Sequence, residues 1–584
     1  MRKLLYFLTV ILMSPMGSVF PETLSNYVSE VKGDTLVVKD YYQMALESNS
    51  LYWVLTLDTL DVPPNRVYEL KVNGYYPLDR TPLTSANRRT VIAGSDPTRV
   101  VNNKNADSSP PLICGNVGES ASGFTCALYA NGDLTIKNCT LVPAANDGTI
   151  GWTFVYAQAP GLHLVFDNCV MEHTRWVFVA LEHPNCAVTF SSCYFVNMSG
   201  GYGDHGGVFD CLANQDSLLV ENCTHVMAQG TLYHFGTNSF NRMIFNHNTF
   251  INCAGLMFNN SSYYNNVSIV SNLFVNCNLH PFDACNDDMP VDQMGLINLY
   301  TDDADTVKAD QKRYLAYRNL AYWDPFLEDC EIVLDTNGVN GSTCWTSQRI
   351  LMDESTQLMF DNDRAYPYLD EGNWYEQMPT FMDPKDLLTT RLSSIKDFVI
   401  DAADDSNEVS LPGWRLINTG SESFVHPDWP VPVDLSYDNP DLIAGAYGGF
   451  PIGDLNWFPA EKAAWLFQRD IEYAYIEENF NFNPFPPDGV GVENHLPQEF
   501  SLDQNYPNPF NPSTTISFSI PKACRVSLKV YDIRGREVAA LLDDFVAAKT
   551  YDLRFDGTDF PSGVYTCTLQ YDDVSVSRKM LVMK

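Results

Sequence analysis

The sequence has no apolar run long enough to cross a membrane as a helix, for which about 18 or more residues are needed. It is also short of positive charge: its 584 residues include 36 Lys and Arg against 72 Asp and Glu, a net charge of −36. Such a surface repels phosphate groups, which excludes nucleic acid and anionic membranes as partners. Nucleotide-binding glycine loops, zinc-finger spacings and nucleophile elbows are missing as well. The acidity is compatible with plain solubility and with calcium binding, which leaves calcium as the one cofactor to consider.

The N-terminal segment has the composition of a secretory signal peptide. Basic residues at Arg2 and Lys3 precede an apolar run at residues 4–13, and a segment containing Ser and Gly follows. The run is too short for a membrane anchor, so the sequence predicts that residues 1–20 direct export.

A repeat occupies the middle of the chain and accounts for the spacing of several of the 15 cysteines. Four similar strings end, one after another, at Cys139, Cys169, Cys193 and Cys223. These strings mark one set of equivalent positions in the repeat, which we call a frame, and the same frame continues at similar steps to Asn248 and Asn272. A second frame contains Asn197, Asn252 and Asn276. A third frame contains Phe178, Phe209, Tyr233 and Met257.

Short strands that recur about every 24 residues, with Asn at the corners, are typical of a parallel β-solenoid, whose stacked coils bury their inward faces together. Asn tolerates the left-handed backbone of a corner and can hydrogen-bond to its copies in neighbouring coils. The four cysteines are expected to form one inward column of small buried side chains. Occasional disulfides between vertically adjacent thiols remain an alternative. A β-propeller needs about four strands per ~40 residues, a period that is missing here, and a sandwich is the other alternative. The sequence therefore predicts an all-β fold built on a solenoid.

This region resembles the right-handed parallel β-helix of the pectate-lyase-like superfamily, over about residues 60–325. Residues 453–457, Gly-Asp-Leu-Asn-Trp, are similar to an element that ends β-helix domains of secreted polysaccharide-degrading proteins. A helix is expected at residues 459–478, where Pro stands in the first turn. The expected organisation is a signal peptide at 1–20, an N-terminal cap at 21–60, the β-helix at 61–325, irregular loops and one helix at 326–480, a Pro- and Gly-rich linker at 481–497 and a C-terminal domain at 498–584.

The C-terminal domain has a different pattern. Residues 526–531 and 564–571 alternate apolar and polar side chains, as half-buried strands do, and turn-forming residues lie at 532–535 and 561–563. This pattern predicts a small antiparallel, Ig-like β-sandwich.

Several motifs of this tail resemble, in order, the C-terminal sorting domain of the type nine secretion system. They are Tyr-Pro-Asn-Pro-Phe-Asn-Pro at 506–512, Val-Tyr-Asp-Ile-Arg-Gly-Arg-Glu-Val at 530–538, Ser-Gly-Val-Tyr at 562–565 and Lys-Met at 579–580. The resemblance covers residues 496–584, and its one departure is Ala-Ala-Lys at 547–549 where a Gly is usual. It implies export through the periplasm and across the outer membrane of certain Gram-negative bacteria, with the secretion machinery as a partner. The expected location is outside the cell or on the outer-membrane surface.

The third frame of the repeat suggests a candidate site. Asp210 follows Phe209 and His234 follows Tyr233, so the two polar side chains are expected to point outward from neighbouring coils, ~4.8 Å apart along the sheet. Asp204, with His205 beside it, lies six residues before Asp210. His173, with Arg175 close by, lies six residues before Val179, and these residues are expected on the same flank. The predicted cluster contains His173, Arg175, Asp204, His205, Asp210 and His234.

Such a cluster could cleave an acidic polysaccharide. Arg175 could neutralise the carboxylate of a uronate, and His205 or His234 could take the proton at C5, with a neighbouring Asp orienting the ring. Hydrolysis needs two carboxylates, which only Asp204 and Asp210 offer. Two His and one Asp could also hold a metal ion. Asp–His pairs on a sheet are often simple cross-strand contacts, however.

Other candidate sites are weaker. The acidic segment with Asp302, Asp303, Asp305 and Asp310 lacks the Gly and the final Glu of an EF-hand, so a solvated loop is expected there. Asn-x-Ser/Thr strings are expected to be corner asparagines rather than glycosylation sites.

Two functions from different classes remain. The chain is either a non-catalytic surface protein that binds extracellular polysaccharide, or a β-helix polysaccharide lyase or glycoside hydrolase, with a lyase favoured over a hydrolase. No Lys lies near the cluster and similar folds host both roles, so binding is placed first and catalysis is left open.

Overall fold

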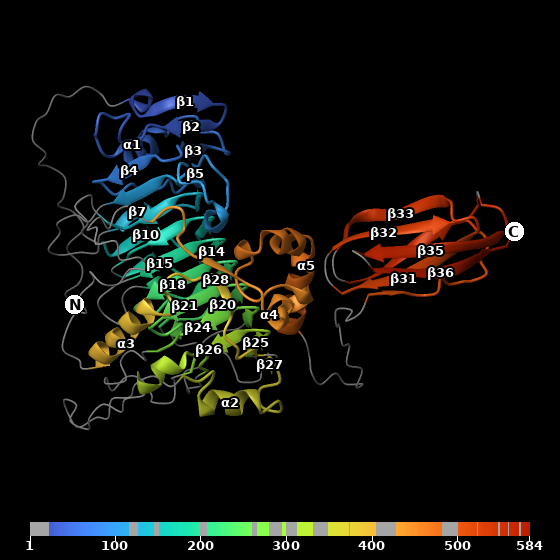
Figure 1. Cartoon of the computed structure of the whole chain (residues 1–584). Coiled ribbons are helices and arrows are strands. Elements are labelled where there is room, and N and C mark those ends of the chain that lie inside the picture. Colours follow the sequence, from blue (N-terminus) through green and yellow to red (C-terminus); the bar gives the residue numbers. More distant parts are fainter. Residues whose placement is uncertain are drawn as a thin grey trace, which may run out of the picture.

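The structure is a computed structural model that describes residues 23–115, 126–144, 151–174, 176–198, 207–236, 238–259, 266–279, 295–299, 312–330, 349–372, 374–403, 428–481, 500–521, 524–546, 549–558, 560–571 and 574–583. Most of the strands belong to a parallel β-helix with three long sheets, which confirms the predicted all-β solenoid (Figure 1). The strands of each sheet come from successive coils and pair in parallel, except for the antiparallel pair at the N-terminal end.

Sheet A contains β1 (Val28–Lys32), β2 (Thr35–Val38), β3 (Val67–Leu70), β5 (Thr90–Gly94), β8 (Leu134–Lys137), β11 (His163–Asp167), β14 (Ala187–Ser191), β17 (Gln215–Glu221), β20 (Phe240–Asn246), β23 (Asn266–Val270), β25 (Arg313–Tyr317) and β27 (Leu369–Gly372). Sheet B contains β4 (Tyr75–Leu78), β6 (Leu112–Gly115), β9 (Thr140–Val142), β12 (Val170–Glu172), β15 (Tyr194–Met198), β18 (Thr224–Ala228), β21 (Thr249–Cys253), β24 (Leu273–Val275) and β26 (Leu320–Tyr322). Sheet C contains β7 (Cys126–Ala130), β10 (Thr153–Ala157), β13 (Val177–Leu181), β16 (Gly207–Cys211), β19 (Tyr233–His234) and β22 (Phe258–Asn259).

From β8 onward, each coil turns from sheet A into sheet B through a single residue in the left-handed conformation. The φ angles, between 50° and 60°, belong to Asn138, Asn168, Ser192, Asn222, His247, Ser271 and Arg318. One left-handed residue redirects the chain sharply, and Asn tolerates this conformation better than most residues. The corner recurs once per coil, which explains the period of the sequence.

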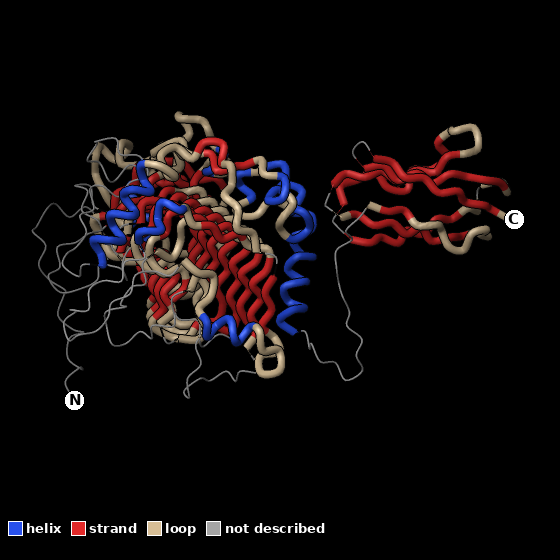
Figure 2. The backbone as a smooth tube through the Cα atoms, turned by 60° about the horizontal axis from the view of Figure 1, so that its bottom comes forward, coloured by secondary structure: helices blue, strands red, loops and turns tan. Residues whose placement is uncertain are grey.

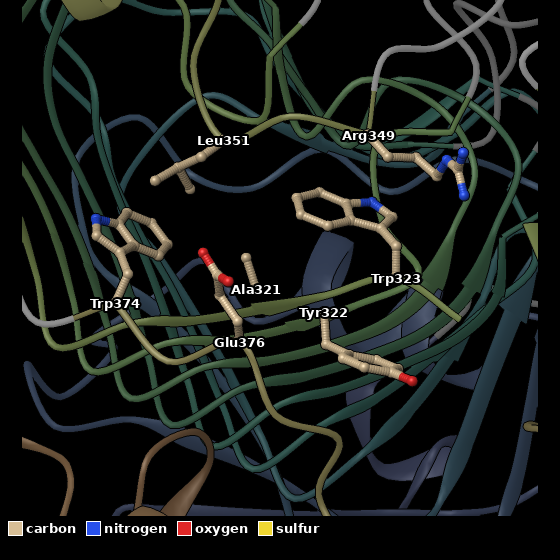
Figure 3. Close-up of a pocket in the computed structure, with 7 residues that line it drawn as sticks. All are labelled: Ala321, Tyr322, Trp323, Arg349, Leu351, Trp374 and Glu376. Atoms are coloured by element: carbon tan, nitrogen blue, oxygen red, sulfur yellow. The ribbon is translucent and has the colours of Figure 1, made fainter. Parts of the chain in front are cut away.

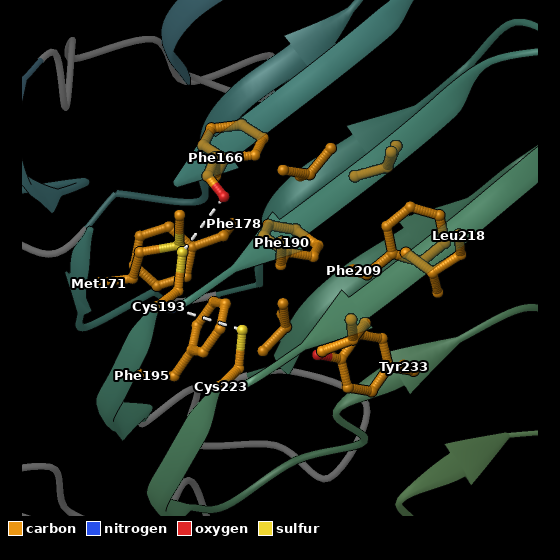
Figure 4. Close-up of a cluster of buried hydrophobic side chains, with 14 of the residues drawn as sticks. Phe166, Met171, Phe178, Phe190, Cys193, Phe195, Phe209, Leu218, Cys223 and Tyr233 are labelled. Carbon is orange, nitrogen blue, oxygen red and sulfur yellow. Dashed lines mark hydrogen bonds between the residues drawn. The ribbon is translucent and has the colours of Figure 1, made fainter. Parts of the chain in front are cut away.

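The residue after each corner forms the predicted inward column. Cys139, Cys169, Cys193 and Cys223 have no exposed surface and belong to the central core. The Cys193 thiol donates to the Phe166 carbonyl of the preceding coil at 3.4 Å, and the Cys193 N–H donates to the Cys223 sulfur at 3.4 Å (Figure 4). In the described residues the cysteines are free thiols, so the column is held by packing and weak hydrogen bonds rather than by disulfides.

The same column continues as a ladder of asparagines. Asn248 Nδ2 donates to Asn272 Oδ1 at 2.9 Å, and Asn272 Nδ2 donates to Asn319 Oδ1 at 3.1 Å. All three side chains are fully buried. A buried amide that satisfies both its donor and its acceptor in neighbouring coils fixes the register of one coil on the next.

The interior also contains a stack of rings from sheet B. Phe195, His225, Phe250 and Phe274 follow one another with ring centroids 4.4, 4.4 and 4.9 Å apart. Burial lowers the pKa of His225 to about 3, so this ring is neutral, and its Nε2 lies 2.9 Å from the Tyr233 hydroxyl. His225 is therefore a packed core residue.

Residues beyond the coils form an outer layer with α2 (Glu354–Phe360), α3 (Thr390–Ala403), α4 (Pro440–Ile443), α5 (Pro459–Asn481) and the antiparallel pair β28 (Phe381–Asp383) and β29 (Asp434–Tyr437). Figure 2 shows these helices outside the stacked strands. Where the sequence predicted one helix, the described part of this layer contains four. The missed α2 to α4 are short, at 7, 14 and 4 residues, and their stability comes from packing on the solenoid rather than from a long amphipathic pattern.

The segment at residues 453–457 fastens this layer to the corners. Thr224 Oγ1 donates to Asp454 Oδ2 at 2.8 Å, and Trp457 Nε1 donates to Thr224 Oγ1 at 2.9 Å. Asn456 Nδ2 donates to the carbonyl of Asn222 at 2.8 Å. The Gly-Asp-Leu-Asn-Trp string is thus a clamp that satisfies polar groups at one corner of the solenoid.

Two smaller parts complete the described chain. At the N-terminal end, α1 (Ser50–Leu57) contributes Leu51 and Val54 to the core of the first coils. The C-terminal domain has two antiparallel sheets, as predicted (Figure 1). Their strands are β30 (Ser501–Leu502), β31 (Ser513–Ile520) and β34 (Lys549–Asp556) in one sheet, and β32 (Cys524–Tyr531), β33 (Glu537–Val546), β35 (Gly563–Tyr571) and β36 (Val574–Val582) in the other.

Candidate functional site

One outward-facing column on sheet C brings chemically useful side chains together. The parallel register places in one line Tyr129, Tyr156, Ala180, Asp210, His234 and Asn259. We call these six residues the sheet C column. Neighbouring strands lie ~4.8 Å apart, so the side chains of adjacent members from Tyr129 to His234 can touch. The hydrophobic clusters under the outer layer contain no residue of this column within the described chain.

Asp210 and His234 are directly paired, as the repeat predicted. His234 Nδ1 lies 2.8 Å from Asp210 Oδ1. The Asp210 side chain is only 5% exposed and that of His234 is 31% exposed. A carboxylate that accepts the Nδ1–H orients the ring and leaves the lone pair of the neutral imidazole on Nε2. The pair therefore has the geometry of a general base with its orienting acid.

Aromatic side chains extend the column on the other side of Ala180. The Tyr129 and Tyr156 rings meet edge to face with centroids 6.2 Å apart. Burial and the neighbouring Glu182 carboxylate, with which the phenol is hydrogen-bonded, raise the pKa of Tyr156. The small Ala180 lies between this tyrosine and Asp210 in the register.

Two tryptophans stand at the start of the same coils. The backbone N–H of Trp176 donates to the backbone carbonyl of Trp152 at 3.0 Å, and both side chains are partly exposed. Neither tryptophan was among the predicted site residues. The available signal was their spacing, because Trp152 and Trp176 stand one period of the repeat apart.

The structure corrects two details of the predicted cluster. His173 is only 1% exposed, with φ 52°, and its Nε2 lies 3.1 Å from Glu172 Oε1. The side chain of His173 is thus enclosed by the protein and does not join the exposed flank. The register places Ala180 beside Asp210, whereas Val179 pairs with Phe209 and points into the core, so the offset counted from Val179 was wrong by one residue. Arg175, Asp204 and His205 lie outside the described residues.

The described residues give no support to a preformed metal site. No group of three or more His, Cys, Asp or Glu side chains among them is arranged to hold an ion. The acidic segment with Asp302 and Asp310 falls outside the described part of the chain.

A second site, an aromatic pocket, lies at the last coil (Figure 3). Its volume is about 420 Å³, and its walls are Ala321, Tyr322, Trp323, Arg349, Leu351, Trp374 and Glu376. Residues 374–376 run beside β26, since the Tyr375 N–H donates to the Asn319 carbonyl and the Ala321 N–H donates to the Tyr375 carbonyl, each at 2.9 Å. Tyr375 pairs with Leu320, so Trp374 and Glu376 face the same side as the core residue Ala321.

Comparison with known proteins identifies the C-terminal domain. Residues 504–583 match the family model described as the secretion system C-terminal sorting domain. No curated protein and no solved structure is found to match the chain. The sorting domain indicates that the protein is exported and is either secreted or attached to the cell surface, with the secretion machinery as a partner. In the described chain, none of the helices has the length and apolar character that crossing a membrane requires.

Proposed function

We propose that this exported β-helix protein binds an extracellular polysaccharide along the sheet C column. The observation that carries the proposal is the alignment of aromatic and hydrogen-bonding side chains from consecutive coils. Sugar rings stack their C–H faces on aromatic rings, and their hydroxyls exchange hydrogen bonds with carboxylates and imidazoles. Tyr129 and Tyr156 offer the first kind of contact, and Asp210 and His234 offer the second.

The shape of the site suits a polymer. Each described strand of sheet C contributes one member at the same position, so the column runs along the axis of the solenoid. A chain of sugars can therefore make repeated contacts on a rigid surface, and binding costs the protein little conformational entropy. The net charge of −36 opposes polyanions, which favours a neutral polysaccharide for the binding function.

The test is binding of the mature full chain to insoluble polysaccharides by co-sedimentation, followed by calorimetry with soluble fragments of any that bind. Tyr156→Ala should weaken binding by about tenfold, because it removes one aromatic platform worth ~1.4 kcal/mol. Tyr42→Ala is the matched control, since Tyr42 is 63% exposed in the N-terminal region and should leave binding unchanged. Equal loss in both variants, or no binding to any member of a broad panel, would refute the proposal.

A second candidate is a β-helix polysaccharide lyase or hydrolase, and the 2.8 Å Asp210–His234 pair is the observation that favours it. In the lyase, His234 Nε2 would take the proton from C5 of a uronate, a C4–C5 double bond would form, and the C4–O bond would break with a proton passing to the leaving oxygen. Arg175 is proposed to neutralise the uronate carboxylate. A hydrolase would instead use Asp210 with a second carboxylate, either Asp204 or the nearby Glu182.

Catalysis is tested by assaying reducing ends and unsaturated products on the same panel, with and without calcium. In an active enzyme, His234→Ala should abolish turnover while the protein stays folded. The 5% exposed Asp210 carboxylate loses its hydrogen-bond partner, so we expect a loss of about 1.5–3 kcal/mol in the free energy of unfolding. Asn241→Ala, an exposed substitution on sheet A, is the control. Full activity of the His234 variant would place the chemistry elsewhere.

A further inference from the structure

We propose that the side chains of Lys462 and Asn456 join in an intramolecular isopeptide bond, with Asp454 as the acid that promotes the reaction. The three residues come from the clamp at residues 453–457 and from the start of α5, so the bond fastens this helix covalently to the corner of the solenoid. The inference does not depend on polysaccharide binding, because none of the three residues belongs to the sheet C column.

The Lys462 amine is held against the Asn456 carboxamide. Lys462 Nζ donates to Asn456 Oδ1 at 2.6 Å and to Ser192 Oγ at 2.8 Å, so it bonds an amide and a hydroxyl rather than a carboxylate. A C=O bond is about 1.23 Å long, so Nζ lies at most about 3.8 Å from the carboxamide carbon Cγ. Reacting atoms in a near-attack arrangement are ~3–3.5 Å apart, so a small shift brings the amine to the carbon.

Both reacting groups are fixed by other hydrogen bonds. Asn456 Nδ2 donates to the carbonyl of Asn222, and the backbone N–H of Asn456 donates to Asp454 Oδ1, each at 2.8 Å. The backbone N–H of Lys462 donates to the carbonyl of Phe458 at 2.8 Å, which sets the first turn of α5 beside the clamp. Groups oriented in this way within one molecule react as if at effective concentrations of about 10⁵–10⁸ M.

Burial prepares the amine as a nucleophile and the carboxyl as an acid. Asp454 and Asn456 are each 1% exposed, and Lys462 is 8% exposed. Burial lowers the pKa of Lys462 to about 8 and raises the pKa of Asp454 to about 6, in both cases against the attraction between the two charges. The state with a neutral amine and a protonated carboxyl is thus about a hundredfold less populated than the ion pair. That population is enough for a modification that happens once in each molecule.

The reaction exchanges one amide for another and needs no oxidant or second reactant. Asp454 is hydrogen-bonded to the side chain of Asn456, so its proton can reach the carboxamide. The neutral Lys462 Nζ attacks Asn456 Cγ while the protonated carboxyl gives its proton to Oδ1. As the Cγ–Nδ2 bond breaks, Nδ2 leaves as ammonia with the proton that Nζ has lost, and the proton on Oδ1 returns to Asp454. The product has one Cγ–Nζ amide bond in place of the Cγ–Nδ2 bond.

The new bond changes what holds the outer layer at this corner. It replaces a buried ammonium with a neutral amide, which is less costly to keep away from water. Its remaining N–H can still donate to Ser192 Oγ. The start of α5 then cannot separate from the clamp even when other parts of the outer layer open.

Mass spectrometry of a tryptic digest of the mature protein tests the proposal. Without the bond, trypsin cuts after Arg415, Lys462 and Arg469 and releases residues 416–462 and 463–469 as two peptides. With the bond, the lysine is no longer a substrate for trypsin. Residues 416–469 should then appear as one peptide, lighter than its sequence by one ammonia molecule.

Three variants assign the roles. Lys462→Arg removes the nucleophile and Asp454→Asn removes the acid, so each should give the two separate peptides with no loss of ammonia. Lys385→Arg is the matched control, because the Lys385 side chain is 43% exposed directly after β28, and this variant should still give the joined peptide.

Two separate peptides from the parent protein would overturn the proposal, and this result does not require any variant to fold. Loss of ammonia with cleavage after Lys462 retained would also overturn it, because it would indicate a succinimide at Asn456 instead of a bond to the lysine. A joined peptide from Asp454→Asn in the same yield as from the parent would refute the role of the acid.

Discussion

Replacing Asn272 with Ala should strongly destabilise the β-helix, although it removes only a few atoms. Asn272 is fully buried directly after the corner residue Ser271. Its Nδ2 donates to the carbonyls of Phe245 and Val270 at 2.9 and 3.0 Å and to Asn319 Oδ1 at 3.1 Å. Its Oδ1 accepts the N–H and the Nδ2–H of Asn248 at 3.0 and 2.9 Å. One amide thus joins three consecutive coils.

The size of the loss in the free energy of unfolding depends on which hydrogen-bonding groups around Asn272 still have a partner after the substitution. Asn319 Oδ1 still accepts the backbone N–H of residue 272 at 2.8 Å, and Asn248 Nδ2 still donates to the Val220 carbonyl at 2.9 Å. The N–H of Asn248 loses its acceptor and stays buried, at a cost of about 1–3 kcal/mol. The remaining lost hydrogen bonds contribute about 0.5–1.5 kcal/mol each and are not fully additive. We expect a loss of ~4 kcal/mol in the free energy of unfolding.

The assay is urea unfolding followed by far-UV circular dichroism, with parent and variant compared at equal transition slope. Asn241→Ala is the matched control, because Asn241 is an exposed asparagine on sheet A, and it should change the free energy of unfolding by less than ~0.5 kcal/mol. A loss below ~1 kcal/mol for Asn272→Ala would show that the ladder is not what fixes the stacking of coils.

Three further predictions concern titration, thiol reactivity and export. Burial raises the pKa of Asp454 to about 6, so between about pH 4 and 6 the folded protein keeps a proton that the unfolded chain has released. The free energy of unfolding should therefore decrease as the pH rises through that window, and Asp454→Asn should flatten the decrease in urea titrations at its two ends. Cys139 and Cys193 have no exposed surface, and burial also raises the pKa of Cys139 to about 12. Because the reagent cannot reach either sulfur, both peptides should stay unalkylated by iodoacetamide in the native protein and react after unfolding; labelling of either in the native state would contradict the inward column. Deletion of residues 496–584 should leave the β-helix folded, as judged by circular dichroism, but retain it in the periplasm in cell fractionation, whereas undiminished surface display would show that the tail is not the export signal.

The solenoid could be predicted because chemically distinctive residues recur at the same position in successive coils. A corner that requires one left-handed residue selects Asn, and an inward position with room for a small side chain selects Cys, so pairs such as Asn168 and Cys169 mark the same place in successive coils. The Asp210–His234 contact could be predicted for the same reason, since residues one period apart become neighbours.

The rest depended on features that a period does not encode. The aromatic pocket combines Trp323, Arg349 and Trp374, which lie on segments separated by irregular lengths of chain, so no spacing marks them as neighbours. His173 was misplaced because sequence shows where a polar residue falls in a coil but not whether its side chain is buried there. The outer layer was missed because it is built from short helices held by tertiary contacts.

The outer layer covers parts of sheets A and B and helps to explain where the sheet C column lies. On sheet B, residues such as Val226 and Ile251 face outward but are buried under α3 and under apolar side chains from residues 431–465. On sheet A, Ile476 of α5 covers the outward side chains of the later strands. Within the described residues, no member of the sheet C column belongs to these apolar clusters. Tyr129, Tyr156 and His234 keep part of their surface exposed, whereas Ala180 and Asp210 are buried between them in the register. A ligand on this face would therefore meet the two tyrosines and His234 first.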